Sequence, residues 1–148
     1  LSKFKGTWRR FEFKGELSSG ALVYDDYAHH PTEIKATLAA ARDKFPERRL
    51  VAIFQPHLYS RTKLLLNDFA ESFTLADEVL IAPIYAAREA PDPTITSELL
   101  AQKVGAKAKS FGNLVEIEDY LRDKSAVNDL IITIGAGNIC DVADALLS

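Results

Sequence analysis

The amino-acid sequence predicts an α/β fold with a mostly parallel sheet, helices on both faces and an antiparallel strand at one edge. From Ala21 to the end, apolar runs alternate with helical patterns, which is the order that parallel βαβ units require. The run Leu50–Phe54 is apolar at every position, as is typical of strands buried on both faces. The length of 148 residues suits a single domain, residues 1–148, with a sizeable core.

The first elements are expected at the edge of the sheet. Trp8–Phe13 alternates bulky and charged residues, which predicts a half-exposed strand, and Lys14–Gly20 is predicted to be a turn. Ala21–Asp26 is the next strand, so the two strands are expected to pair antiparallel. A helix is predicted over Pro31–Phe45, because proline suits the first helical position and Pro46 ends the pattern.

The rest of the chain continues the alternation. Three apolar runs predict inner strands and a shorter run predicts another strand: Leu50–Phe54, Glu78–Ala82, Asp129–Ile134 and Lys107–Phe111. Helices are predicted around the apolar stripe Leu65, Phe69 and Phe73, over Thr96–Val104 with Gly105 as its cap, from Asn113 to about Arg122 with Glu116 in a capping box, and after Gly135–Asn138.

The composition argues against several classes of function. A formal net charge of −3 provides no basic surface for phosphate contacts, which argues against nucleic-acid binding. No apolar run has the length of a membrane span, and no signal peptide is visible. Cys140, the one cysteine, is expected to be a packed core thiol, which fits a cytoplasmic protein. The sequence lacks methionine and opens on Leu1, so we expect a piece of a longer protein, with residues 1–7 as the tail of a preceding domain.

One strand-to-helix corner, Asp25 to Glu33, crowds two carboxylates, a phenol and two imidazoles. Ligands of open α/β sheets bind at corners of this kind. Pro31 is placed for the first helical position, and Glu33 in the first turn complements the helix dipole. This corner is therefore the first candidate for a binding site.

Polar and cationic residues follow the other inner strands as well. All three histidines, the arginines Arg61 and Arg88, and a glycine turn come directly after inner strands. In a parallel sheet these loops share one edge, so His29 and Arg61 are expected on a single rim. Arg61 beside His57 forms a cationic corner that suits a carboxylate or a phosphate.

Several roles stay open for the residues of this corner. His29 and His30 do not indicate a metal site, because adjacent side chains diverge and no third ligand has a suitable spacing. One of them is expected to cap the helix and the other to contact a nucleotide or a substrate oxyanion. Asp25 and Asp26 are consistent with an acid–base pair, a ribose-binding acid or, for one of the two, a solvated strand end.

Phosphate-binding motifs are weak or missing. The turn Gly135-Ala136-Gly137 permits close approach of a ligand to a helix N-terminus, but it lacks the third glycine of the dinucleotide fingerprint. The sequence contains no G-x-x-x-x-G-K-[ST] loop, so this chain does not hold a nucleoside triphosphate by that route.

Taken together, four segments resemble the C-terminal domain of the Mur ligases. They are Asp25-Asp26-Tyr27-Ala28-His29-His30-Pro31-Thr32-Glu33, Phe54-Gln55-Pro56-His57-Leu58-Tyr59-Ser60-Arg61-Thr62, Tyr85-Ala86-Ala87-Arg88-Glu89 and Gly135-Ala136-Gly137-Asn138. The resemblance extends over nearly the whole chain and implies a Rossmann-like third domain. In such a ligase the first domain holds the UDP-sugar, the second carries the phosphate-binding loop and magnesium, and the third closes over ATP and brings the amino acid.

The resemblance also implies an activity. It is ATP-dependent ligation of L-alanine to UDP-N-acetylmuramate, through an acyl phosphate, in peptidoglycan precursor synthesis in the bacterial cytoplasm. The implied cofactors are ATP and Mg²⁺, with the metal held mainly by the central domain. The implied partners are L-alanine, ATP, UDP-N-acetylmuramate and the N-terminal and central domains, so this chain alone is expected to be inactive. A closing domain would gain rate by positioning reactants and placing cations where negative charge develops.

Site residues are carried over by position in the motifs. The implied substrate-binding residues are Tyr27 and His29 on the alanine and phosphate side, His57 and Arg61 at the alanine carboxylate, and Arg88. The implied nucleotide-binding residues are Asp25 or Asp26 near the ribose, His30 and Asn138. Some relatives have an arginine where this chain has Leu58, so the resemblance does not carry over one expected carboxylate contact at this position.

Three rival interpretations remain open at this point. Within the family, a recycling ligase attaches a ready-made tripeptide to the same sugar and shares an Asp-Asp-x-Ala-His-His-Pro stretch. Its pattern lacks Gln-Pro-His-x-Tyr-Ser-Arg, which favours alanine. Outside it, the alternatives are a non-catalytic α/β ligand-binding module and a histidine-based metal hydrolase, which would need a bound metal.

Overall fold

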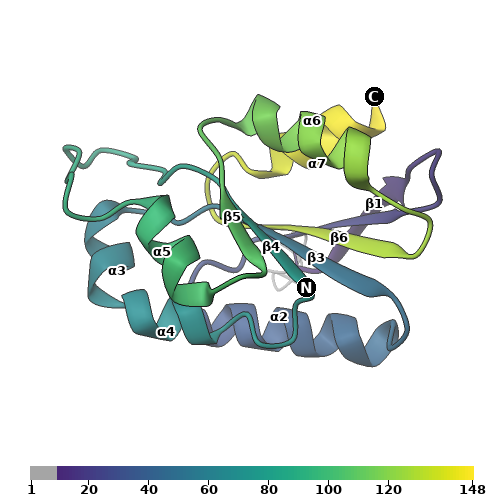
Figure 1. Ribbon diagram of the computed structural model, residues 1–148, viewed down its shortest axis with the longest axis horizontal. Helices are drawn as coiled ribbons and strands as arrows, with labels where there is room; N and C mark the ends of the chain where they lie inside the picture. The colour runs from purple at the N-terminus through teal and green to yellow at the C-terminus, as the bar shows by residue number, and fades with distance from the viewer. Residues whose placement is uncertain (1–9) are drawn as a thin grey trace, which may run out of the picture.

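The computed structural model describes residues 10–148, which form one six-stranded sheet flanked by helices (Figure 1). The strands are β1 (Glu12–Glu16), β2 (Leu22–Asp26), β3 (Arg49–Phe54), β4 (Glu78–Ile81), β5 (Ala108–Ser110) and β6 (Asp129–Ile134). The helices are α2 (Pro31–Lys44), α3 (Tyr59–Leu64), α4 (Leu66–Glu71), α5 (Ser97–Val104), α6 (Leu114–Lys124) and α7 (Cys140–Leu147).

The strand order is β1-β2-β6-β3-β4-β5. β1 pairs with β2 antiparallel, and the four other pairings in the sheet are parallel. The predicted α/β class, with a mostly parallel sheet and an antiparallel edge strand, is therefore confirmed. The order also brings β6, the last strand of the chain, between β2 and β3, so that three corners separated in sequence become neighbours.

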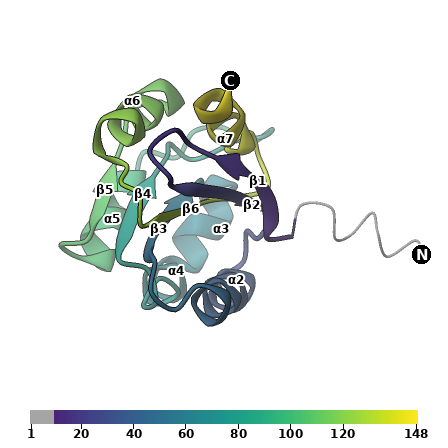
Figure 2. The same ribbon diagram turned by 90° about the vertical axis from the view of Figure 1, so that its right-hand side faces the viewer.

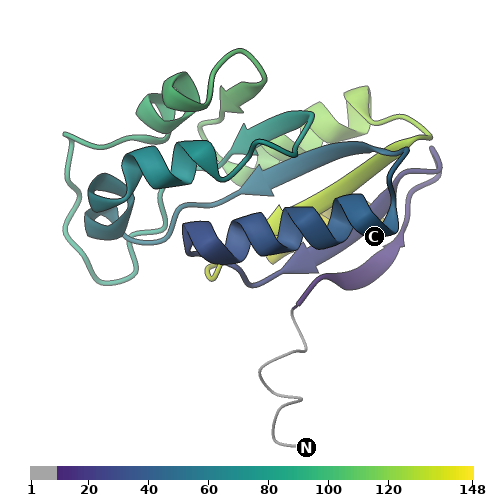
Figure 3. The same cartoon turned by 90° about the horizontal axis from the view of Figure 1, so that it is seen from below.

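Helices cover both faces of the sheet, as predicted (Figures 2 and 3). One apolar cluster packs α2, α4 and α5 against the sheet, and a second packs α6 and α7 against the other face. Consecutive strand residues point to opposite faces, so Leu50, Ala52 and Phe54 join the first cluster while Val51 and Ile53 join the second. This alternation explains why an inner strand here is apolar at every position.

The edge hairpin differs from the prediction in the bounds of its first strand and its turn. β1 runs over Glu12–Glu16 and thus extends into the segment predicted as a turn. Leu17 and Ala21 close the shorter turn, because the amide of Leu17 donates to the carbonyl of Ala21 at 2.8 Å. A β-bulge between Phe13 and Gly15 lets the strand continue through the glycine. The predicted start at Trp8, and the predicted linker over residues 1–7, lie outside the described residues.

The helix predicted around Leu65, Phe69 and Phe73 is two shorter helices, and Phe73 lies beyond the end of the second one. α3 ends at Leu64 and α4 begins at Leu66, because Leu65 leaves the helical region with φ −109° and ψ 24°. Phe69 and Phe73 are buried as predicted, each with its ring about 5 Å from that of Phe54. The apolar stripe begins after α3, whose one buried residue is Thr62.

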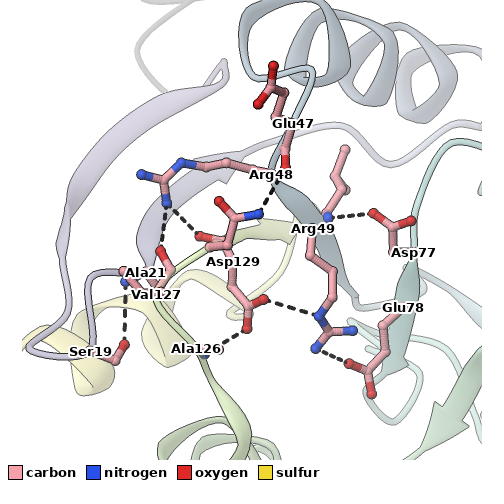
Figure 4. A network of polar contacts seen from close by, with 12 residues as sticks. Ser19, Ala21, Glu47, Arg48, Arg49, Asp77, Glu78, Ala126, Val127 and Asp129 are labelled. Carbon is pink, nitrogen blue, oxygen red and sulfur yellow. Dashed lines mark hydrogen bonds and ion pairs between the residues drawn. The ribbon is translucent and has the colours of Figure 1, made fainter.

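The amino ends of the parallel strands are joined by a polar network (Figure 4). The guanidinium of Arg49 donates to Asp129 at 3.1 Å and to Glu78 at 2.9 Å, which ties β3 to its two neighbours β6 and β4. The hydroxyl of Tyr120 on α6 donates to Glu78, and burial together with this carboxylate raises the pKa of Tyr120 to about 12. Charged groups at this rim thus pair with one another and join the strands.

Candidate functional site

Four aromatic side chains meet at the opposite rim, beside the carboxyl ends of the strands. The ring of His29 lies 5.6 Å from that of Tyr27 and 6.1 Å from that of His57, with edge-on geometry in both pairs. The ring of His57 stacks on that of Tyr85, with centroids 5.6 Å apart and planes inclined by 17°. The expectation that the histidine-bearing corners share one rim is therefore confirmed. We call these four residues the aromatic row.

Arg61 joins the aromatic row through His57. A guanidinium N–H of Arg61 donates to Nδ1 of His57 at 3.3 Å. Arginine has no acceptor, so Nδ1 must be unprotonated and the proton of the neutral ring sits on Nε2. Burial, followed by the positive charge of Arg61 and by His29, lowers the pKa of His57, while Glu89 opposes the shift. The result is a neutral imidazole beside a fixed cation.

The backbone of Leu58 makes this approach possible. Leu58 has φ +74° and ψ 133°, a conformation that L side chains rarely adopt. Its amide donates to the carbonyl of Tyr85 at 2.8 Å, and its carbonyl accepts from the Thr62 hydroxyl at 2.7 Å. These bonds hold the sharp turn between β3 and α3. The turn brings the side chain of His57 next to that of Arg61, which lies four residues later in the chain.

The two histidines of the corner between β2 and α2 have different partners. His30 is the N-cap of α2, and its Nδ1 accepts from the amide of Thr32 at 3.2 Å. Glu33 closes the capping box by accepting from the amides of His29 and His30. Burial acts to raise the pKa of Glu33, but the hydrogen bonds and the electrostatic interaction with His29 outweigh it, so the pKa is lowered. Of the two residues, His30 therefore caps the helix.

His29 turns toward the rim instead. Its Nδ1 lies 3.2 Å from the carbonyl of Tyr27 and 3.6 Å from a carboxylate oxygen of Glu33. Both neighbours are acceptors, so Nδ1 carries the proton of the neutral ring and Nε2 remains as its second polar atom. His29 and Tyr27, which is 46% exposed, thus present polar groups at the rim.

Asp25 and Asp26 lie in the interior. They are 1% and 5% exposed, so the interpretation of either as a solvated strand end is wrong. They are consecutive on β2 and point to opposite faces of the sheet, which also rules out a side-by-side acid–base pair. Asp25 accepts from the hydroxyl of Thr133 at 2.7 Å.

Asp26 organises the entry to the corner. Its carboxylate accepts from the amides of Phe11 and Ala28 at 2.8 Å and from the hydroxyl of Thr37 at 3.0 Å. Burial raises the pKa of Asp26 in spite of these three bonds. The carboxylate thereby ties the segment that enters the domain to the turn that carries His29.

The glycine turn after β6 packs against protein side chains. Gln55, 4% exposed on the rim of β3, donates to Asn138 Oδ1 at 2.7 Å and accepts from the amide of Ile139 at 3.2 Å. A side chain at Gly137 would lie 2.6 Å from Gln55 Oε1 and 2.8 Å from the ring of Tyr85. The space beside Gly137, which was predicted to admit a ligand, is occupied in part by Gln55 and Tyr85. The sequence analysis assigned no role to either residue.

The loop after β4 is fastened to α3. Glu89 accepts from the amide and the hydroxyl of Ser60, and these bonds, chiefly that of the hydroxyl, lower the pKa of Glu89. Asp92 pairs with Lys63 at 3.5 Å. Arg88 lies exposed on this loop.

Beside the loop, a cavity of about 410 Å³ lies between the segments that follow β4 and β5. Its lining residues include Tyr59, Ile84, Ser97 and Phe111.

Residues 10–148 contain neither a membrane-spanning helix nor a metal-binding cluster of side chains. No helix in this part of the chain has both the length and the apolar character that crossing a bilayer needs. The same residues contain no group of three His, Cys, Asp or Glu side chains that could hold a metal ion.

Comparison with known proteins shows the family to which the chain belongs. Residues 9–137 match the family described as Mur ligase, glutamate ligase domain. The chain is 49% identical to the UDP-N-acetylmuramate–L-alanine ligase of Caldanaerobacter subterraneus, over 99% of this chain and 32% of that protein. The chain thus spans about a third of the length of the curated relatives it matches.

Two solved structures are similar as well. One is the UDP-N-acetylmuramate–alanine ligase of Thermotoga maritima, with a TM-score of 0.76 and 27% identity over 94% of this chain and 29% of that one. The other is a murein peptide ligase of Psychrobacter arcticus, with a TM-score of 0.72 and 27% identity over 94% of this chain and 29% of that one. The chain belongs to the Mur ligase family, and corresponds to its C-terminal domain.

Proposed function

We propose that this chain is the C-terminal domain of a bacterial, cytoplasmic ligase that joins L-alanine to UDP-N-acetylmuramate at the expense of ATP. The observation that carries the proposal is the meeting of Arg61, His57 and His29 at one rim, with an Arg61–His57 separation of 3.3 Å. The identity of 49% to an L-alanine ligase over nearly the whole chain supports the choice of amino acid.

In the proposed reaction, the muramoyl carboxylate attacks the γ-phosphorus of ATP, ADP leaves, and an acyl phosphate forms. The amine of L-alanine attacks the acyl carbon, phosphate leaves, and the amide and a released proton complete the balance. The proposed role of Arg61 is to bind the alanine carboxylate with charge-assisted hydrogen bonds, next to the Nε2–H of neutral His57. His29 and Tyr27 would face the leaving phosphate, where negative charge develops.

The cofactors divide between this domain and the rest of the enzyme. Acidic groups around the rim are engaged within the chain: Asp26 in the entry turn, Glu33 in the capping box and Glu89 on Ser60. This arrangement does not suit Mg²⁺, which we assign to the central domain. For ATP we propose that exposed His30 and Asn138 contact the nucleotide, and that Asp25 and Asp26 act by holding the turns beside it. Exposed Arg88 is proposed as a further substrate contact.

The murein peptide ligase remains the second candidate, because it shares the fold. The two solved structures do not separate the candidates, since both are 27% identical to this chain. The discriminating experiment measures phosphate release by the full-length enzyme with ATP and UDP-N-acetylmuramate, using either L-alanine or the tripeptide as the amine. Release with L-alanine alone is the expected result, and release only with the tripeptide would overturn the assignment.

Inactivity of the isolated chain is a separate expectation. The 148-residue chain should give a dispersed amide NMR spectrum but no ATP hydrolysis above background, because the phosphate-binding loop is not in its sequence. ATP-dependent ligation by this chain alone would contradict the proposal that its activity needs the other domains.

A further inference from the structure

Tyr85 lies opposite His57 across a backbone bridge that extends the sheet beyond β3 and β4. The amide of Leu58 donates to the carbonyl of Tyr85, and the amide of Tyr85 donates to the carbonyl of Pro56, both at 2.8 Å. Residues that face one another across such a bridge hold their side chains close together. In this pairing the rings of His57 and Tyr85 lie nearly parallel, with their planes inclined by 17°.

The ring of Tyr85 is held from a second direction by the glycine turn after β6. An added Cβ at Gly137 would lie 2.8 Å from Tyr85 Cγ, nearer than real side chains approach one another. The ring therefore occupies the space that a side chain at position 137 would need. The turn itself is fixed by Gln55, which bonds both Asn138 and Ile139.

Two constraints then act on the imidazole of His57. The stack with Tyr85 sets the plane of the ring, and the bond from Arg61 to Nδ1 sets its rotation within that plane. With both in place, the direction of Nε2–H is determined. Neither constraint alone achieves this, since a stacked ring still flips and a single 3.3 Å hydrogen bond still allows the ring to tilt.

We propose that Tyr85 is a positioning residue that, seated on Gly137, holds the imidazole of His57 so that its Nε2–H points at the ligand bound by Arg61. Tyr85 acts through His57 and needs its ring for this task, not its hydroxyl. The identification of that ligand as the alanine carboxylate rests on the function proposed above, whereas the effect of Tyr85 on His57 does not.

The first test uses the 148-residue chain and NMR of the His57 ring. Tyr85→Ala should move the His57 ring proton shifts by loss of the ring current and raise the pKa of His57 toward its ordinary value, because the covering ring is gone. The groups that face His57 from neighbouring elements, Arg61, His29 and Glu89, stay in place in this variant. Tyr85→Phe should leave both readouts as in the parent chain.

A second variant covers the case in which Tyr85→Ala does not fold. Gly137→Ala keeps the tyrosine but displaces its ring, so it should shift the same His57 signals. Val115→Ala, which shortens a 60% exposed side chain on α6, is the control. It should change neither the ring proton shifts nor the pKa of His57. Folded Tyr85→Ala or Gly137→Ala chains with unchanged His57 signals would overturn the proposal, as would a Tyr85→Phe chain that behaves like Tyr85→Ala.

The second test uses the full-length enzyme. Tyr85→Ala should raise KM for L-alanine several-fold with little change in KM for ATP, and Tyr85→Phe should restore the parent value. If the NMR result holds while both KM values stay unchanged, the positioning of His57 stands and its assignment to the alanine site is wrong. Unchanged NMR signals would overturn the positioning role whatever the kinetics show.

Discussion

Arg61 donates a hydrogen bond to Nδ1 of His57 at 3.3 Å, from one turn further along the chain. The bond exists only while His57 is neutral, because a protonated ring offers a donor and a positive charge in place of an acceptor. The pair therefore presents one fixed cation and one directed N–H donor to the rim. Such a pair suits a carboxylate better than either residue would alone.

Arg61 should matter more for the amino acid than for the nucleotide. In the full-length enzyme, Arg61→Ala is expected to raise KM for L-alanine about 10- to 100-fold, the loss typical of a charge-assisted hydrogen bond. KM for ATP should change much less. Steady-state kinetics with each substrate varied in turn checks this, with Lys63→Ala on the same helix as the control. Equal increases in both constants would count against the carboxylate role.

His57 should make the stability of the domain depend on pH in the weakly acidic range. Burial and Arg61 lower the folded-state pKa below its ordinary value of 6.5, so the unfolded chain binds the proton first as the pH falls. The stabilisation is complete above 6.5 and is lost as the pH falls through the folded pKa. Urea unfolding at about pH 7.5 and about pH 5.5 should therefore show a smaller loss of stability in His57→Gln than in the parent chain. An identical loss in both chains would exclude this contribution.

Gln55 should contribute to stability through the N-terminus of α7. Gln55→Leu removes the acceptor of the buried Ile139 amide and the donor to Asn138. The expected loss is about 1–3 kcal/mol in the free energy of unfolding, the cost of leaving a buried polar group unpaired. Gln102→Leu on the exposed side of α5 makes the same chemical change and should alter the stability little. Chemical denaturation of both variants decides between them.

Replacement of Asp26 by asparagine should destabilise the domain. In Asp26→Asn one carboxylate oxygen becomes an NH₂ group, which then faces a donor, because both oxygens accept from N–H or O–H groups. A destabilisation of about 1–3 kcal/mol is expected. Faster exchange of the Phe11 or Ala28 amide should accompany it. The matched change Asp43→Asn, at an exposed position of α2, serves as control. Stability equal to the parent would mean that the carboxylate charge is not needed in the turn.

Local patterns in the sequence were enough to predict the elements and their common rim. The continuous apolar run of β3, the proline at the start of α2 and the caps of α5 and α6 each depend on residues a few positions apart. The alternation of strands and helices then implied a parallel sheet, and a parallel sheet places His29 and Arg61 at one edge. None of these inferences required the order of the strands.

Tertiary structure decided how the residues of the rim divide their roles. Gln55 reaches the amide of Ile139 across 84 positions of the chain, and the ring of Tyr85 meets His57 only because β4 lies beside β3. Whether Asp26 faced solvent or donors depended on where Phe11 and Thr37 arrived. Such contacts follow from the strand order and from packing between elements distant in sequence, for which local periodicity and capping carry no signal.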